Sequence, residues 1–273
     1  MTRILIAMLF CGAAAAAQGP RILIVTDMEG LEGVNDAEEQ ILPGQRRYEE
    51  TRRILIGDVN AAIEGASQGG ASEIVVWDGH DGSRSLSVED IASPGKLLQG
   101  RPTPANYYMS ERAYDGIIFI GQHPMAGTKN GVLAHSQSFN VRQISINGKP
   151  VGELGQVAAI GGYFGIPVIM LTGDEMACAE MLALQPKAFT VPLKRQAGKL
   201  STLSISHAEA VSRTREAARK AVQSVKDFQP WKIEGPVELK FEFHPQPPQQ
   251  PEARTVIYKG RTVLEAFEAW LGK

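Results

Sequence analysis

Short apolar runs, rich in β-branched residues, alternate along the chain with segments of helical periodicity. The apolar runs are bounded by glycine, proline or polar residues, which is typical of buried strands. The strands predicted in this way are residues 21–26, 72–77, 116–120 and 167–172. The helices predicted from the longer periodic segments are residues 48–66, 153–163 and 206–225. Strands that alternate with helices predict an α/β fold, with a largely parallel sheet flanked by helices.

Towards the C-terminus the pattern is less regular. Asn147-Gly148 favours a hairpin between two antiparallel strands, and residues 237–243 alternate as a strand does. Residues 244–251 contain four prolines, which exclude regular structure because proline fixes φ and lacks an amide donor. Residues 264–271 predict a short amphipathic helix. We therefore expect a core of about residues 21–190 and a smaller C-terminal α+β portion, about residues 191–273.

The first 18 residues differ from the rest of the chain. Arg3 provides a positive charge, the following apolar stretch is too short to span a bilayer, and the alanines at positions 15 to 17 offer a cleavage site. We predict a signal peptide over residues 1–18, one domain over residues 19–273, and an exported protein, periplasmic or secreted, that does not bind membranes after signal removal. Cleavage would leave Cys178 alone, as a small buried hydrophobic residue without a disulfide partner.

The charge of the chain is nearly balanced, with 28 basic and 30 acidic residues among 273. No basic run or basic stripe interleaved with aromatic residues occurs, which excludes a typical nucleic-acid-binding protein. Apolar residues make up 43% of the chain, enough for one large domain, or for one domain with a small lobe.

Metal-binding side chains follow three of the predicted strands. Asp27 and Glu29 come directly after the first strand, His80 follows the second, and His123 follows the third. Because alternate residues of an extended chain project to one side, the two carboxylates converge. The carboxyl ends of parallel strands meet at one edge of the sheet, where ligands bind in open α/β folds. A solvated turn or a structural histidine would explain each feature alone, but the recurrence at three strand ends favours a metal site.

Carboxylates together with imidazoles suit zinc or a similar divalent ion. A pair of ions about 3.5–4 Å apart requires a bridging carboxylate and several further ligands. Glu153, which begins a predicted helix among small residues, is a candidate for one of these, although the helix dipole alone would explain an acidic residue there. His135 lies in a glycine-rich stretch, and His207 begins a predicted helix and is expected at the surface.

Five short motifs occur in a fixed order along the chain. They are Asp27-Met28-Glu29-Gly30, Asp78-Gly79-His80, Gly121-Gln122-His123, Leu133-Ala134-His135-Ser136 and Val151-Gly152-Glu153-Leu154-Gly155. In this order and approximate spacing the chain resembles the bacterial D-aminopeptidases of peptidase family M55, from about residue 21 to residue 174. Leu264-Glu265-Ala266-Phe267 is similar to the terminal helix of that family.

The resemblance implies two zinc ions per subunit, with manganese or cobalt as other possible metals. The residues that match the metal ligands of the family are Asp27, Glu29, His80, His123 and Glu153. His135 matches the histidine regarded as catalytic. The implied activity is release of N-terminal D-amino acids from short peptides by metal-activated water, in a ring-shaped homo-oligomer. From the predicted export, we expect peptides that contain D-Ala as substrates. The chain departs from the family pattern in two places. Because of the predicted signal peptide, the resemblance does not determine the natural substrate. Because of the proline-rich loop, it does not determine the geometry of the oligomer.

Two other functions remain consistent with these residues. One is a different binuclear metallohydrolase, an amidase or a phosphoesterase, although the motifs lack a basic cluster to hold a phosphate. The other is an exported protein that binds metal or peptide without catalysis, although a binding protein would not need His135. Asp78 is expected either to bind the substrate amine or to orient a histidine ligand. The preference for D- or L-residues is not determined by any motif.

Overall fold

A seven-stranded sheet forms the centre of the computed structural model, which describes residues 19–272; the predicted signal peptide lies outside the described residues. The strands in spatial order are β3 (Lys96–Leu98), β2 (Glu73–Trp77), β1 (Arg21–Thr26), β4 (Gly116–Gln122), β7 (Val168–Asp174), β8 (Phe189–Gly198) and β9 (Ser201–Ser204). All neighbouring strands are parallel except β8 and β9, which form an antiparallel hairpin. The predicted α/β fold with a largely parallel sheet is therefore confirmed.

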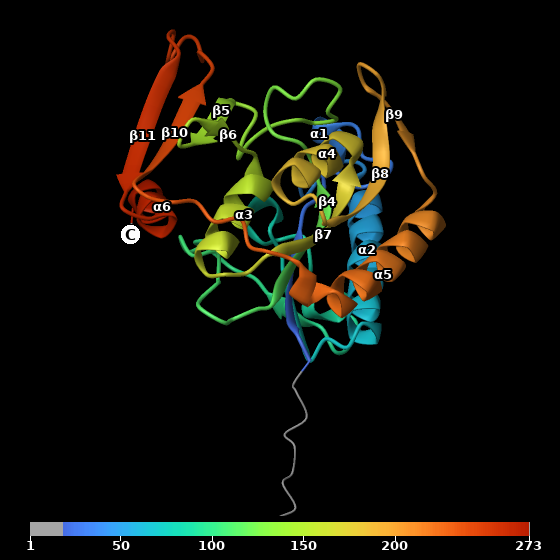
Figure 1. Ribbon diagram of the computed structural model, residues 1–273. Coiled ribbons are helices and arrows are strands. Elements are labelled where there is room, and N and C mark those ends of the chain that lie inside the picture. The colour runs from blue at the N-terminus through green and yellow to red at the C-terminus, as the bar shows by residue number, and fades with distance from the viewer. Residues whose placement is uncertain (1–18, 273) are drawn as a thin grey trace, which may run out of the picture.

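Helices cover both faces of this sheet (Figure 1). The helices on one side are α1 (Ala37–Gln40), α2 (Tyr48–Gln68) and α5 (His207–Gln223), of which α2 and α5 lie side by side. The helices on the other side are α3 (Glu153–Tyr163) and α4 (Glu175–Leu184). Among residues 19–272, no helix has the length and apolar character needed to cross a bilayer.

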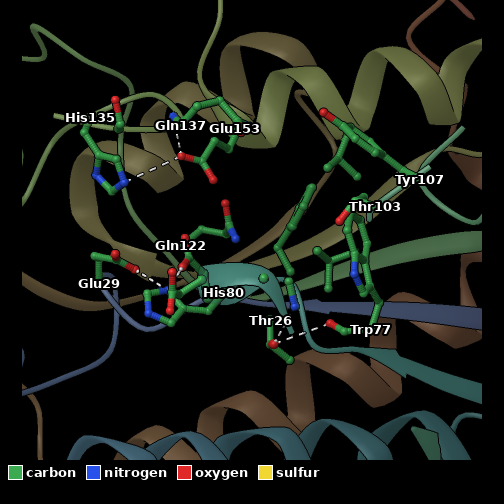
Figure 2. Close-up of a pocket in the computed structure, with 18 of the residues that line it drawn as sticks. Thr26, Glu29, Trp77, His80, Thr103, Tyr107, Gln122, His135, Gln137 and Glu153 are labelled. Carbon is green, nitrogen blue, oxygen red and sulfur yellow. Dashed lines mark hydrogen bonds and ion pairs between the residues drawn. The ribbon is translucent and has the colours of Figure 1, made fainter. Parts of the chain in front are cut away.

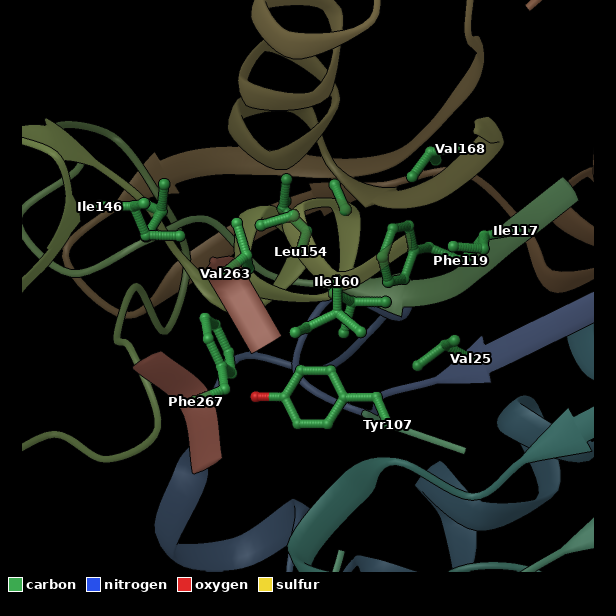
Figure 3. Close-up of a cluster of buried hydrophobic side chains, with 14 of the residues drawn as sticks. Val25, Tyr107, Ile117, Phe119, Ile146, Leu154, Ile160, Val168, Val263 and Phe267 are labelled. Atoms are coloured by element: carbon green, nitrogen blue, oxygen red, sulfur yellow. The ribbon is translucent and has the colours of Figure 1, made fainter. Parts of the chain in front are cut away.

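The strand residues divide between two hydrophobic cores. Successive side chains of a strand point to opposite faces, so Leu23 and Val25 pack beneath α3, while Ile22 and Ile24 pack beneath α2 and α5. Figure 3 shows the first of these cores, with Val25 and Phe119 near Ile160 of α3. Burial on both faces explains why the central strands are continuous apolar runs rather than alternating ones.

A second, antiparallel sheet of four strands lies beside the first. Its strands in spatial order are β11 (Arg254–Gly260), β10 (Val237–Phe243), β5 (Val141–Ile146) and β6 (Lys149–Pro150). The expected turn at Asn147-Gly148 joins β5 to β6, and the proline-rich segment joins β10 to β11. Helix α6 (Val263–Leu271) packs against this sheet, with the rings of Trp270 and Phe241 4.9 Å apart.

The boundary between the two sheets does not coincide with the expected division near residue 191. Strands β8 and β9 and helix α5 lie with the large sheet, although they follow or span that position. The small sheet joins β5 and β6 from the first part of the chain to β10 and β11 from the end, because β10 pairs with β5. The rings of Phe267 in α6 and Tyr107, 5.7 Å apart, connect this part to the core of the large sheet.

Cys178 is buried in α4, as expected from its sequence context. Burial, and next the charge of Asp174, raise the pKa of its thiol to about 12. The thiol therefore stays protonated near neutral pH and packs as a small hydrophobic side chain, which excludes a role as an activated nucleophile.

Candidate metal centre

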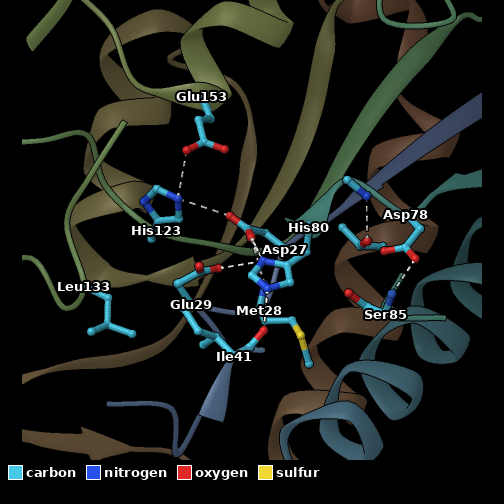
Figure 4. Close-up of polar contacts among 12 residues, drawn as sticks. Asp27, Met28, Glu29, Ile41, Asp78, His80, Ser85, His123, Leu133 and Glu153 are labelled. Carbon is cyan, nitrogen blue, oxygen red and sulfur yellow. Dashed lines mark hydrogen bonds and ion pairs between the residues drawn. The ribbon is translucent and has the colours of Figure 1, made fainter. Parts of the chain in front are cut away.

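Three neighbouring strands bring the expected residues together at the carboxyl edge of the large sheet. Asp27 directly follows β1, His80 lies in a short 3-10 turn (His80–Gly82) after β2, and His123 directly follows β4. Strand β1 lies between β2 and β4, so the segments that leave these strands are adjacent. The side chains of all three residues are buried and face one another (Figure 4).

The Asp27 carboxylate lies between two histidines. Its Oδ1 is 3.0 Å from Nδ1 of His80, and its Oδ2 is 3.3 Å from Nε2 of His123. Glu29 Oε2 lies 3.1 Å from the same Nδ1 of His80. On the other side, Glu153 Oε1 lies 3.5 Å from Nε2 of His123. Asp27 therefore presents one carboxylate oxygen to each of the two histidines.

Backbone carbonyls fix the orientation of all three histidine rings. One ring nitrogen of His80, of His123 and of His135 donates a hydrogen bond to a carbonyl, so the other nitrogen of each ring can bind a metal once it has lost its proton. The accepting carbonyls belong to Ile41, Pro124 and Leu133, at 2.7, 3.0 and 2.8 Å respectively. The free nitrogens face the carboxylates, which is the arrangement that metal-ligating histidines adopt.

Several atoms of this cluster that could bind a metal have no hydrogen-bond partner among the described residues. They are Asp27 Oδ2, Glu29 Oε2 and His123 Nε2, all buried. One ligand atom from each of these residues lies within 4.8 Å of the others, and His123, His135 and Glu153 form a second such group. Buried polar atoms without partners cost free energy, and a divalent ion would satisfy them. The residues present therefore fit zinc, which binds carboxylate oxygen and imidazole nitrogen.

The charges of the cluster are strongly coupled. Burial, and next the charge of Glu29, raise the pKa of Asp27 to about 7. Burial alone would lower the pKa of His123, but the carboxylates of Asp27 and Glu153 outweigh it and raise the pKa to about 10. Burial would likewise raise the pKa of Glu29, but His80 outweighs it and holds that pKa well below its usual range. The cluster thus requires positive charge, which a divalent cation provides with release of protons.

His135 differs from the other two histidines. Its ring stacks on His123 with the centroids 3.8 Å apart, and its Nε2 is 3.6 Å from Glu153 Oε1. Burial, and next the charge of His123, lower its pKa, so the imidazole is neutral near neutral pH. A neutral imidazole next to the other candidate ligands can accept or return a proton.

Four of the candidate ligands, Asp27, Glu29, His80 and Glu153, line the floor of a pocket of about 560 Å³ (Figure 2). This volume is in the range of small-molecule sites. Its aromatic walls consist of Trp77, Tyr107, Phe119, Phe139 and Trp270. The walls come from both parts of the molecule, because Trp270 belongs to α6 and Phe139 precedes β5. The site therefore combines an acidic floor with apolar walls.

Asp78 has a role that was not expected. Its carboxylate accepts hydrogen bonds from the backbone amides of Ser85, at 2.8 Å, and Leu86, at 3.0 Å. Asp78 is buried and does not line the pocket. It holds the segment after His80 in place, and the ring nitrogens of His80 bond to Asp27 and Ile41 rather than to Asp78.

Two charged residues that the sequence did not single out, the partly buried Glu180 and the buried Lys194, position the loops of the site. Glu180 of α4 accepts hydrogen bonds from the backbone amides of Met125, at 2.9 Å, and Gly152, at 3.3 Å, next to His123 and Glu153. The amine of Lys194 in β8 donates to the carbonyls of Glu29 and Val34. Burial lowers the pKa of Lys194 to about 7, against the opposing charge of Asp174. No motif marks either residue, and only the placement of α4 and β8 reveals them.

Fold and site together define a metal-dependent hydrolase. The model of peptidase family M55, described as D-aminopeptidase, matches residues 21–269. A D-aminopeptidase of Bacillus subtilis (strain 168) is 30% identical over 263 residues, which are 92% of this chain and 95% of that protein. The solved structure of the Zn-dependent D-aminopeptidase DppA from Bacillus subtilis, a self-compartmentalizing protease, matches with a TM-score of 0.83 at 29% identity, over 92% of this chain and 96% of that one.

The chain therefore belongs to peptidase family M55, the D-aminopeptidases. This finding confirms the resemblance seen in the motifs. It also confirms the class of enzyme that the resemblance implied, a metal-dependent aminopeptidase.

The close approach of two loops at Gly30 generates a first prediction. A Cβ on Gly30 would lie 1.9 Å from the carbonyl oxygen of Gln122, next to His123. Replacement of Gly30 by Ala is therefore expected to separate Glu29 from His123 and to weaken zinc binding by roughly 10- to 100-fold, as loss of ligand support does. Calorimetric zinc titration of the chelator-stripped variant measures this effect.

Gly198→Ala is the matched control, because a Cβ there lies 3.5 Å from the Ser201 side chain. This variant is expected to bind zinc as the parent protein does. Equal zinc affinities of the two variants would contradict the role assigned to the close approach.

Proposed function

We propose that this protein is a zinc-dependent aminopeptidase that releases N-terminal D-amino acids from short peptides. Two zinc ions are held by Asp27, Glu29, His80, His123 and Glu153. The observation that carries the proposal is the Asp27 carboxylate, with one oxygen facing His80 and the other facing His123. The similar structure of the Zn-dependent enzyme from Bacillus subtilis supports zinc as the metal, and the donor set also accepts manganese or cobalt.

The division of ligands follows from the contacts. His80 and Glu29 lie on one side of Asp27, and His123 and Glu153 lie on the other. Zinc, when bound, supplies the Lewis acidity that activates water and polarises the scissile carbonyl. The protein contributes the orientation of the ligands, through the carbonyls that fix each histidine ring.

His135 is the proposed catalytic residue. It lines the pocket, and its Nε2 lies on the side of Glu153, where it can take a proton from the attacking water or donate to the developing oxyanion. Its stacking on His123 and on Phe139, with centroids 3.8 and 4.5 Å apart, fixes the ring plane. This ring does not need to leave its position to serve either role.

The charge of the pocket favours a peptide over a phosphate ester. Among the described residues that line it, the acidic ones are Asp27, Glu29, Asp81 and Glu153, and none is lysine or arginine. Bound zinc would offset the charge of the carboxylates that hold it, so the feature that disfavours a phosphate ester is the lack of lysine and arginine to clamp its oxygens. Apolar walls suit a small side chain such as that of alanine, so short peptides that begin with D-Ala are the proposed substrates.

Metal dependence and stereochemistry are tested together on matched D-Ala and L-Ala p-nitroanilides. Chelator-stripped protein is expected to be inactive, and added zinc is expected to restore cleavage of the D-substrate by at least roughly 10²-fold, since the metal supplies the nucleophile. The rate of p-nitroaniline release measures this. Failure of zinc-loaded protein to cleave either compound would overturn the proposal, and cleavage of the L-form alone would overturn its stereochemistry.

Replacement of His135 by Ala is expected to lower kcat/KM by roughly 10²- to 10⁴-fold while zinc content is unchanged. The neutral form of the imidazole acts as the base. The ring becomes protonated, and activity falls, as pH drops through its pKa, which lies below the usual 6.5. Bound zinc lowers this pKa further, so the acidic limb of the parent enzyme is expected below pH 6.5. Rates and zinc content are measured across pH, with His244→Ala as the control. Loss of zinc from the His135→Ala variant would count against a purely catalytic role.

We also propose that residues 1–18 direct export and that the mature protein is periplasmic or secreted. The charge, apolar stretch and small residues of this segment support the proposal. Expression of the full chain in a Gram-negative host is expected to give periplasmic protein that begins near Gly19, as mass spectrometry of the intact chain measures. Full-length protein confined to the cytoplasm would contradict it.

The assembly is proposed to be a ring-shaped homo-oligomer. The similar enzyme from Bacillus subtilis is described as self-compartmentalizing. Leu200 and Leu203, at the β8–β9 hairpin, are 70% and 56% exposed, and such apolar side chains suit a contact between subunits. Light scattering of the purified protein distinguishes an oligomer from a monomer.

A further inference from the structure

A second cluster of acidic and imidazole side chains lies outside the pocket. Glu32 belongs to the segment that follows β1, Asp58 lies in α2, and His207 is the first residue of α5. One ligand atom from each of the three lies within 4.8 Å of the others. None of them lines the pocket that holds the candidate active site.

The two carboxylates of this cluster are buried, and three of their four oxygens lack a hydrogen-bond partner among the described residues. Glu32 is 3% exposed and Asp58 is not exposed at all. Glu32 Oε2 and both carboxylate oxygens of Asp58 have no hydrogen-bond partner among the described residues. Burial, and next the charge of Glu32, raise the pKa of Asp58 well above its usual range. Two buried carboxyl groups in contact require a positive charge or a proton between them.

The buried amine of Lys194 is directed away from these carboxylates. Lys194 donates its hydrogen bonds to the carbonyls of Glu29 and Val34, on either side of Glu32 in the chain. His207 instead faces the carboxylates: its Nδ1 is 2.7 Å from Glu32 Oε1 and 3.9 Å from Asp58 Oδ1. The carboxylates of the cluster are therefore in contact with the imidazole of His207, whereas the amine of Lys194 bonds to backbone carbonyls.

The position of His207 depends on the absence of a side chain at Gly57. A Cβ on Gly57 would lie 2.4 Å from Nε2 of His207, so only glycine lets the ring lie against α2. The His207 side chain is 43% exposed, which leaves one side of the cluster open to water. That opening provides an entry path and free coordination positions.

We propose that Glu32, Asp58 and His207 bind a divalent ion of the zinc class, at a site separate from the metal centre of the pocket. Two carboxylates and one imidazole form a donor set that zinc accepts, with water as the fourth ligand. Ligand atoms of tetrahedral zinc lie about 3.4 Å apart, because the bonds are about 2.1 Å long. The separations of 2.7 and 3.9 Å from His207 Nδ1 lie on either side of this value, so small side-chain rotations are sufficient.

An ion at this position connects three segments that are distant in the sequence. It joins α2, α5 and the segment after β1, and Glu32 lies in the same loop as the active-site residue Glu29. The site is therefore structural: its occupation stabilises the native fold by mass action and does not take part in the reaction.

Zinc stoichiometry tests this site. The full chain is stripped with chelator, titrated with zinc, desalted and measured by plasma mass spectrometry. His207→Gln and Asp58→Asn are each expected to hold one zinc ion per subunit fewer than the parent protein. His244→Gln, which removes an exposed imidazole outside the cluster, is expected to hold the parent number. Zinc is also expected to raise the thermal midpoint of the two cluster variants less than that of the parent.

The comparison separates this inference from the proposed function. The expected difference of one ion does not depend on how many ions the pocket holds or on whether peptides are cleaved. His207→Gln is expected to retain peptidase activity. Because the His207 ring is exposed, this variant keeps the test valid even if Asp58→Asn fails to fold. Equal zinc numbers in the parent protein and His207→Gln would overturn the site, and would indicate that a shared proton holds the two carboxyl groups.

Discussion

The burial of two neighbouring carboxylates, Asp27 and Glu29, is the constraint around which the candidate active site is arranged. In a medium of low dielectric, two such groups repel each other and lose hydration, so both remain ionised only if positive charge lies in contact. His80 and His123 provide that contact, and backbone carbonyls hold their rings so that the free nitrogens face the acids. The same orientation that relieves the repulsion prepares the rings as metal ligands.

Close backbone packing makes this arrangement possible. Strand β1 lies between β2 and β4, and the segment after β1 folds against the end of β4. Gly121, with φ of 76°, permits the contact, because a Cβ there would lie 2.2 Å from the carbonyl oxygen of Asp27. Glu180 and Lys194 then anchor the loops from α4 and β8. The geometry of the centre thus depends on elements from both faces of the sheet.

The sequence predicted those parts of the molecule that depend on local pattern. The strands that carry Asp27, His80 and His123 are continuous apolar runs, and α3 and β10 were predicted to the residue. Strand β8 was not predicted, because Pro192 and the buried Lys194 interrupt its apolar pattern. Strand β11 was not predicted either, although Thr255 to Tyr258 carries a recognisable β-branched run.

The roles of Glu180 and of the cluster at Glu32 were beyond prediction for a different reason. Their partners lie on separate elements, and only tertiary packing brings them together. His207 was expected at the surface, and its side chain is indeed partly exposed. Its contact with Glu32 depends on the packing of α5 against α2, which no spacing in the sequence encodes.

The chemistry and the selectivity of the pocket arise from different parts of the molecule. Loops of the large sheet and the first residue of α3 supply the acidic floor, whereas α6 and the segment before β5 supply Trp270 and Phe139 as walls. The two parts meet where Phe139 stacks on His135. A change in the walls can therefore alter which side chain is accepted without changing the ligand set. Stereochemical preference, which depends on the side from which a residue approaches the floor, is accordingly a property of the walls, and the ligand motifs carry no information about it.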